Sequence, residues 1–145
     1  MLSAFLNRLT SPAPGSESLS GRLALAALMV RLARADGDYA EAEIARIDAT
    51  LTRRYGLSAF DAAALRQRAE ALEADASDSV RFTRAIKEAV PHEDREEVLA
   101  ALWQVVLADG RRDDEEDGLM RLLASLLGIN DRDSALIRQR VSRAG

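Results

Sequence analysis

The sequence predicts an all-α protein, a helical bundle of about seven helices, and three observations point to this fold class. From residue 20 onward Ala, Leu, Arg and Glu dominate, and these residues favour helices. The period-two alternation of β-branched residues that is typical of strands is missing. Apolar residues instead recur at intervals of three and four, as on one face of a helix. We expect helices over residues 20–35, 41–55, 59–74, 78–90, 93–108 and 114–127, and a last helix that opens at Asp131 or Asp133.

The composition limits the class of protein. A length of 145 residues, 48% of them hydrophobic, suits one domain with one core and is too apolar for a disordered chain. The net charge of -4 provides no overall basic field to attract nucleic acid. Cysteine is absent, which excludes disulfides, thiolate metal sites and Cys nucleophiles. No apolar run approaches the roughly 18 residues of a membrane span, so we expect a cytoplasmic protein without a transmembrane segment.

Residues 1–19 are expected to stand apart from the helical domain at 20–145. Pro, Gly and Ser dominate the stretch "SPAPGSESLS" at 11–20, which predicts a flexible linker. The apolar residues before it share one face of a short helix: Leu2, Phe5, Leu6 and Leu9. We favour a short helix docked on the domain, with a frayed terminus or a weak membrane or partner anchor as alternatives.

The first two helices of the domain each carry a continuous apolar stripe. In the helix at 20–35 the stripe consists of Leu25, Leu28, Met29 and Leu32. In the helix at 41–55 it consists of Ile44, Ile47, Leu51 and Tyr55. Gly56 is well placed to end the second helix in a left-handed conformation.

The next two helices are bounded by polar residues and by a proline. Ser58 caps the helix at 59–74. Its inward residues are expected to be Phe60, Ala64, Leu65 and Leu72. The polar run "DASDS" breaks that helix, and the following one carries Phe82, Ile86 and Val90 before Pro91 ends it.

The three remaining helices complete the bundle. Trp103 lies on the apolar face of the helix at 93–108, so we expect it in the core. Gly128 ends the helix at 114–127. The basic residues of the last helix are Arg132, Arg138, Arg140 and Arg143. We interpret them as a solvated face paired with acidic surface, and binding to a partner, anionic lipid or nucleic acid is the alternative. The nucleic-acid case is weak without interleaved aromatics.

An internal repeat relates two parts of the chain. A shift of 73 residues aligns Ala35-Asp36-Gly37 with Ala108-Asp109-Gly110. The other aligned pairs are Leu25 with Val98, Met29 with Leu102, Leu32 with Val105, Glu43 with Glu116, Ile47 with Met120 and, after one deletion, Tyr55-Gly56-Leu57 with Leu127-Gly128-Ile129. We therefore expect helix–loop–helix units at about 20–57 and 93–129. Two such hairpins can pack around a pseudo-two-fold axis with their loops equivalently placed.

The doubled motif resembles the TerB-like family, which covers tellurite-resistance TerB proteins and the similar helical domain of DjlA-type co-chaperones. The motif is Ala-Asp-Gly, five residues, Glu, three residues, and Ile or Met, and the resemblance covers roughly residues 20–130. It implies an all-helical bundle with a duplicated core. It also implies a metal-binding role for the acidic loops, in stress-response systems that work near the membrane. The His-Pro-Asp triplet of J domains is absent, so J-domain chaperone activation is not implied.

Helix capping explains part of the two acidic loops. Gly37 and Gly110 are well placed to end helices. In the second loop Asp113 and Glu116 have the spacing of a capping box. Ala40, the matching residue of the first loop, cannot cap, and Asp38 with Glu41 offers a shifted box instead. Capping at a helix start thus accounts for both Glu43 and Glu116.

Capping explains the Asp before each Gly less well. Asp36 and Asp109 fall in the last turn of a helix, where the dipole disfavours a negative charge. A hard cation such as Ca²⁺ or Mg²⁺ would offset that cost, because it binds carboxylate oxygens. The predicted ligands are Asp36, Asp38 and Glu43 in the first loop and Asp109, Asp113 and Glu116 in the second. Neither loop has the spacing of an EF-hand. Capping alone, cation binding and a protein-partner surface remain open as explanations. Arg111 and Arg112 favour capping alone, because they neutralise the acidic run at residues 113–117.

No enzyme motif is present. The sequence contains no HExxH, GxSxG, Walker or GxGxxG pattern. His92 is the only histidine and is expected to be a solvated surface residue. The sequence therefore predicts a non-enzymatic module that binds a divalent cation and engages protein partners, membrane-associated ones among them. The alternative is a purely structural interaction module whose acidic loops are helix caps without metal.

Overall fold

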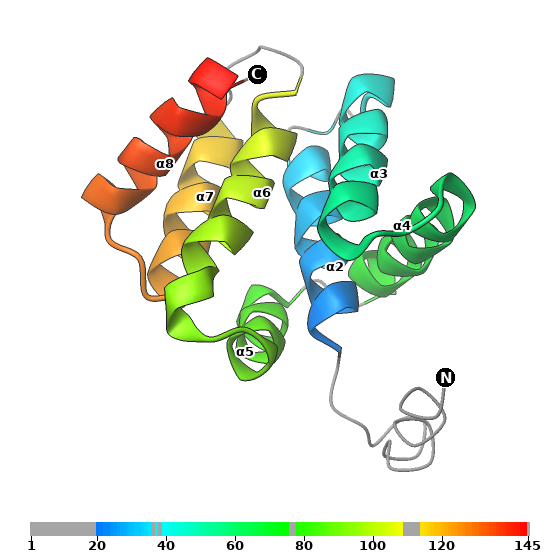
Figure 1. The fold of residues 1–145 in the computed structure, drawn as a ribbon, viewed down its shortest axis with the longest axis horizontal. Helices are drawn as coiled ribbons and strands as arrows, with labels where there is room; N and C mark the ends of the chain where they lie inside the picture. Colours follow the sequence, from blue (N-terminus) through cyan, green and yellow to red (C-terminus); the bar gives the residue numbers. More distant parts are fainter. Residues whose placement is uncertain (1–19, 36, 38, 76–77, 109–113, 145) are drawn as a thin grey trace.

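The computed structural model describes residues 20–35, 37, 39–75, 78–108 and 114–144, and the expectations for residues 1–19 lie outside them. Every regular element among the described residues is helical, which confirms the all-α prediction (Figure 1). The elements are α2 (Gly21–Arg34), α3 (Glu41–Tyr55), α4 (Ala59–Asp75), α5 (Ser79–Ala89), a 3-10 turn (His92–Asp94), α6 (Arg95–Val106), α7 (Asp114–Leu126) and α8 (Asp131–Ala144).

The connection from α5 to α6 differs from the expected helix over 93–108. A 3-10 turn follows Pro91, and α6 begins only at Arg95. The Arg95 side chain reaches back to the end of α5, where it donates to the carbonyls of Val90 (3.2 Å) and Lys87 (3.1 Å). Carbonyls at the carboxyl end of a helix lack amide partners within that helix. The Arg95 guanidinium therefore caps α5 and holds the connection to α6 in place.

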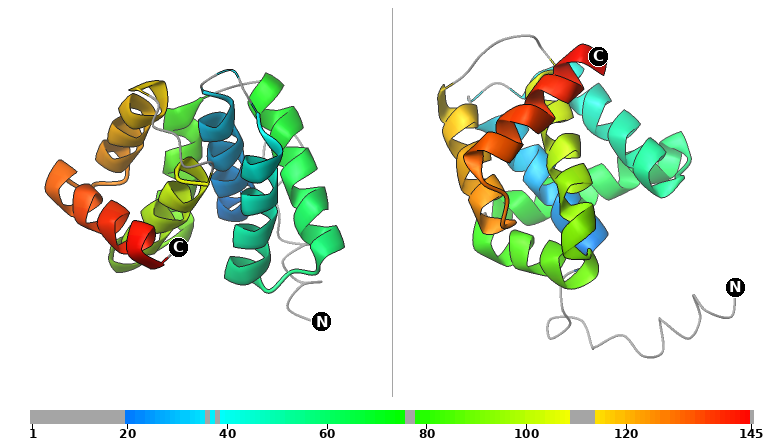
Figure 2. Two further views of the ribbon diagram at one scale, coloured as in Figure 1. Left: turned by 90° about the horizontal axis from the view of Figure 1, so that it is seen from above. Right: turned by 60° about the vertical axis from the view of Figure 1, so that its left-hand side comes forward.

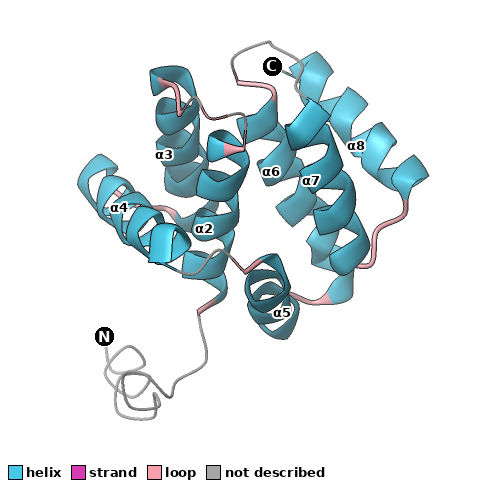
Figure 3. Cartoon of the chain, turned by 180° about the vertical axis from the view of Figure 1, so that it is seen from behind, coloured by secondary structure: helices cyan, strands magenta, loops and turns pink. Residues whose placement is uncertain are grey.

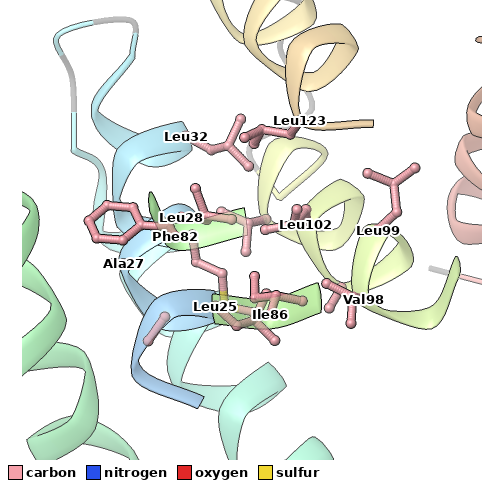
Figure 4. Close-up of a cluster of buried hydrophobic side chains, with 14 of the residues drawn as sticks. Leu25, Ala27, Leu28, Leu32, Phe82, Ile86, Val98, Leu99, Leu102 and Leu123 are labelled. Carbon is pink, nitrogen blue, oxygen red and sulfur yellow. The ribbon is translucent and has the colours of Figure 1, made fainter. Parts of the chain in front are cut away.

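The core forms around α2, which packs against all of α3, α4, α5, α6 and α7. Residues 24–30 of α2 are all buried, since a central helix has neighbours around its whole circumference. Figure 4 shows Leu28 of α2 with Phe82 of α5 and Leu102 of α6, all fully buried. Trp103 is buried as well, which confirms its predicted place in the core.

The predicted inward face of α4 is wrong for Phe60, which is 82% exposed. Ala64 and Leu72 are only partly buried, whereas Leu65 is buried as expected. The face that packs on the bundle consists of Ala62, Leu65, Ala69 and Glu73, at helical spacings of three and four. Phe60 lies two residues from Ala62 and so points to nearly the opposite side of the helix. Small alanines, rather than the aromatic ring, allow α4 to pack closely.

The helices form two similar three-helix units, α2–α3–α4 and α6–α7–α8, with α5 between them along the chain (Figures 1 and 2). Gly56 and Gly128 both adopt positive φ, 63° and 83°. The residue after each glycine donates back to the preceding helix, Leu57 to Thr52 at 3.2 Å and Ile129 to Ala124 at 2.8 Å.

The third helices of the two units also begin alike. Ser58 Oγ accepts from the Asp61 amide at 3.0 Å, and Asn130 Oδ1 accepts from the Asp133 amide at 2.8 Å. Both are N-cap bonds to the third helical residue. The correspondence of local structure therefore extends beyond the expected 20–57 and 93–129 units to α4 and α8. Origin by duplication stays a prediction.

Both acidic connections begin and end at one end of the bundle. The carboxyl ends of α2 and α6 and the amino ends of α3 and α7 lie there, at the top of Figure 1 and of the rear view in Figure 3. The arrangement follows from two antiparallel hairpins that run in the same direction.

Candidate functional site

The structure describes two of the six predicted metal-ligand side chains, Glu43 and Glu116. They are the third residues of α3 and α7, and each is only 1% exposed. The other four residues lie outside the described part of the chain: Asp36, Asp38, Asp109 and Asp113. The aligned glutamates of the repeat thus occupy the same position in their helices, and both are carboxylates taken out of water.

Glu43 serves the start of α3. Its Oε1 accepts a hydrogen bond from the Ala40 amide at 3.2 Å. Ala40 is the N-cap in extended conformation, with φ -74° and ψ 154°. An alanine side chain cannot accept the reciprocal bond, so only the glutamate half of a capping box exists here. The capping role predicted for Glu43 is confirmed. Asp38, the other member of the shifted box, lies outside the described residues, and Glu41 is the first residue of α3 instead of the third.

Tyr39 anchors the amino end of α3 to α4. Its hydroxyl donates to Glu70 Oε2 at 2.7 Å. The Arg34 guanidinium lies 5.2 Å from the Tyr39 ring centroid and donates to Glu73 Oε1 at 2.8 Å. Glu73 is buried, so this ion pair is shielded from solvent on one side. The residues that flank the first acidic loop are therefore held by α4.

Arg66 extends these contacts to α3. Its Nε donates to Asp48 Oδ1 at 2.6 Å, and another guanidinium nitrogen donates to Glu70 Oε2 at 2.9 Å. The hydrogen bond to Asp48 raises the pKa of Arg66 above its usual value. Tyr39, Glu70, Arg66 and Asp48 thus form one chain of hydrogen bonds, which we call the α4 network. Sequence reasoning missed it, although the Arg66–Glu70 spacing on one helix was a visible signal.

The second half of the molecule carries different residues at the matching positions. Leu107 stands for Arg34, Arg112 for Tyr39, Arg121 for Asp48 and Ser142 for Glu70. The tyrosine–carboxylate bond and the Arg66–Asp48 ion pair therefore cannot be reproduced there. The two acidic loops therefore occupy matching positions in the repeat, but the side chains expected to flank them are different.

The Tyr39–Glu70 bond leads to a pH-dependent prediction. Burial, and then the hydrogen bond to Glu70, raise the pKa of Tyr39 above its usual value. Below about pH 10 the tyrosine is protonated in both states and its stabilisation is complete. At higher pH the unfolded chain loses this proton first, so the free energy of unfolding falls as pH rises. Tyr39→Phe should lower that free energy by about 1 kcal/mol at neutral pH and should weaken its decline above about pH 10.

Urea denaturation of both proteins between neutral pH and about pH 11 measures this effect. Tyr55, the other tyrosine, is retained in both proteins, so its titration cancels in the comparison. Equal declines for wild type and Tyr39→Phe would contradict the role assigned to the bond.

Other candidate chemistry is sparse among the described residues. No three described His, Asp or Glu side chains lie together as a group that could hold a metal ion. His92 is exposed, as predicted, with its Nδ1 3.4 Å from a guanidinium nitrogen of Arg95. The helices in the described ranges are all too short or too polar to cross a membrane.

Comparison with known proteins identifies a family for the chain. The family model described as tellurite resistance protein TerB matches residues 22–139, from the first turn of α2 into α8. The match covers most of the chain and both acidic loops. Searches of curated proteins and of solved structures gave no match.

Proposed function

The chain is thus a member of the TerB family, and from this premise we propose that it is a cytoplasmic, non-enzymatic module of the tellurite-resistance type. In this proposal the two Asp-Gly loops bind a divalent cation of the Ca²⁺ or Mg²⁺ kind. The module also engages protein partners through its surface.

One observation supports cation binding most strongly: Glu43 and Glu116 are each 1% exposed at matching helix starts. Each glutamate carries its carboxylate oxygens at the start of the helix that follows an acidic loop. Ca²⁺ and Mg²⁺ take oxygen ligands, so each glutamate is placed to contribute one ligand to a cation at its loop. The remaining ligands would be Asp36 and Asp38 beside Glu43, and Asp109 and Asp113 beside Glu116.

The alternative is a purely structural interaction module. The bond from the Ala40 amide to Glu43 Oε1 favours it, since that bond gives the glutamate a role without metal. The two proposals differ in what the aspartates do. Caps at the helix starts leave Asp36 and Asp109 dispensable, whereas cation binding requires them.

Calorimetric titration of metal-free protein with Ca²⁺, Mg²⁺, Mn²⁺ and Zn²⁺ separates them. We expect binding below millimolar for one of the hard cations. The double variant Asp36→Asn with Asp109→Asn should weaken it by roughly tenfold or more, because cation affinity follows the number of charged ligands. Asp61→Asn with Asp94→Asn removes the same charge from exposed positions and is the matched control.

Two results would count against the proposal. Absence of binding below millimolar would leave the structural module as the function. Binding that the double variant retains at full strength would remove the two loops as the site. Pull-down from membrane and soluble fractions, with and without the cation, would then identify the partners that the module engages.

A further inference from the structure

A cavity of about 190 Å³ lies between α6, α7 and α8, and its lining includes Asp117, the residue after Glu116 in the first turn of α7. Its volume is roughly six times the space of one water molecule in the liquid, which suits a small ion or molecule. Its polar lining side chains are Trp103, Asp117, Arg121, Asp131, Ser134 and Arg138. Figure 2 shows α8 packed beside α6 and α7, where these side chains originate.

Trp103 and Ser134 organise one wall of the cavity. The Trp103 indole Nε1 donates to Ser134 Oγ at 3.3 Å. Because Ser134 uses an oxygen lone pair in this bond, its own hydroxyl proton stays available to a ligand. The Arg138 guanidinium lies 5.0 Å from the Trp103 ring centroid, in a cation–π contact. This contact positions the guanidinium without neutralising its charge.

The two arginines of this cavity differ from the matching residues of the first three-helix unit. There, Arg66 of α4 forms an ion pair with Asp48 of α3 at 2.6 Å. The matching residue for Arg66 is Arg138, and the matching residue for Asp48 is Arg121. The alignment is secure at this point, since Ile47 and Met120, one residue earlier, are both fully buried. An ion pair in one unit therefore corresponds to two arginines in the other.

Arg121 and Arg138 both line this cavity. Across the described ranges, neither Arg121 nor Arg138 forms an ion pair, although Asp117 and Asp131 line the same cavity. Two guanidinium groups that face one small space repel each other, and an anion between them would remove the repulsion. Guanidinium groups also bind oxyanions by paired hydrogen bonds.

We propose that this cavity binds a small oxyanion that carries a protonated oxygen, such as hydrogen phosphate. Arg121 and Arg138 bind the charged oxygens, and the Ser134 hydroxyl donates a further hydrogen bond. The carboxylate of Asp131 accepts from the single P–OH group, a bond that a fully ionised oxyanion cannot offer. The acidic lining therefore selects phosphate over sulfate. The cavity shares no residue with the six proposed cation ligands, although Asp117 directly follows Glu116.

Titration of metal-free protein with inorganic phosphate tests the proposal. Trp103 is the only tryptophan of the chain, so its fluorescence reports on this cavity, and calorimetry measures the affinity independently. We expect a saturable response to phosphate and an affinity for sulfate that is weaker by roughly tenfold or more, since sulfate has no O–H to donate to Asp131. Arg121→Gln, at an exposed position, should weaken phosphate binding by a similar factor. Arg68→Gln, also exposed, should leave it unchanged.

Two further variants address the mechanism. Arg121→Asp recreates the pairing of the first unit and should abolish phosphate binding while the helical circular dichroism is retained. Asp131→Asn should reduce the preference for phosphate over sulfate. Phosphoserine is mostly fully ionised at neutral pH, so it should bind as weakly as sulfate. Equal binding of phosphoserine and inorganic phosphate would contradict the role of the P–OH group. The proposal fails if phosphate gives neither heat nor a fluorescence change below millimolar, if sulfate binds equally well, or if Arg121→Gln and Arg68→Gln behave alike.

Discussion

Replacing Phe82 by Ala is expected to lower the free energy of unfolding by about 3–5 kcal/mol. Phe82 is fully buried on α5 and packs in the cluster that α5 shares with α2 and α6 (Figure 4). The truncation removes the transfer free energy of the ring and leaves a cavity that the surrounding helices can close only in part. Small domains have total stabilities of roughly 5–15 kcal/mol, so this change would remove a large fraction. Urea denaturation followed by circular dichroism measures it.

The matched control is Phe60→Ala, which removes the same atoms from a side chain that is 82% exposed. Its effect should stay within about 0.5 kcal/mol, as for surface substitutions without special contacts. Similar losses for the two variants would contradict the burial described here.

The contrast between the two phenylalanines explains where sequence reasoning succeeded. In α5, Phe82 and Ile86 fall on one face and the opposite face is mostly charged, so periodicity identified the buried side. In α4, alanines occur all around the helix, and apolar pattern alone does not select a face. The buried face of α4 is determined by close packing against α2 and α3, which favours small residues. Helix bounds were predicted well because caps, Gly and Pro act locally.

The candidate site likewise contains local contacts, which the sequence predicts, and long-range contacts, which it does not. The Glu43 cap depends on residues three apart in sequence and could be predicted from spacing. The α4 network connects Tyr39, Asp48 and Glu70, which lie on separate segments, and no periodicity links them. That Arg121 and Arg138 replace an ion pair could be recognised only from the repeat alignment together with the Arg66–Asp48 contact of the first unit. Long-range contacts of this kind are set by tertiary packing, which a single sequence does not encode locally.

Arg66→Met is expected to lower the free energy of unfolding by about 2–3 kcal/mol, because hydrogen bonds to charged groups are strong where solvent is excluded. The Arg66 side chain is 13% exposed and neutralises two carboxylates, Asp48 and Glu70. Methionine retains most of the apolar stem. What the variant loses is therefore the charge and its hydrogen bonds, and it leaves both carboxylates with less compensation for their partial burial.

Arg140→Met is the matched control for this prediction. Arg140 bonds Glu97 at 3.0 Å, but the two side chains are 55% and 62% exposed. Water screens such a pair, so the loss should stay below about 1 kcal/mol. Arg66→Lys should recover only part of the stability, since one ammonium cannot reproduce the fixed fork that serves two carboxylates.

A double-mutant cycle isolates the central contact of the α4 network. Combining Arg66→Met with Asp48→Asn should give a coupling energy of about 1–2 kcal/mol, because each single variant already loses the same ion pair. Coupling near zero would mean that the 2.6 Å contact contributes no net stability. The α3–α4 contact would then depend on apolar packing alone, and the replacement of this pair by Arg121 and Arg138 in the second unit would cost nothing. Measurable coupling, in contrast, gives the free energy that the second unit forgoes by placing two arginines at the same positions.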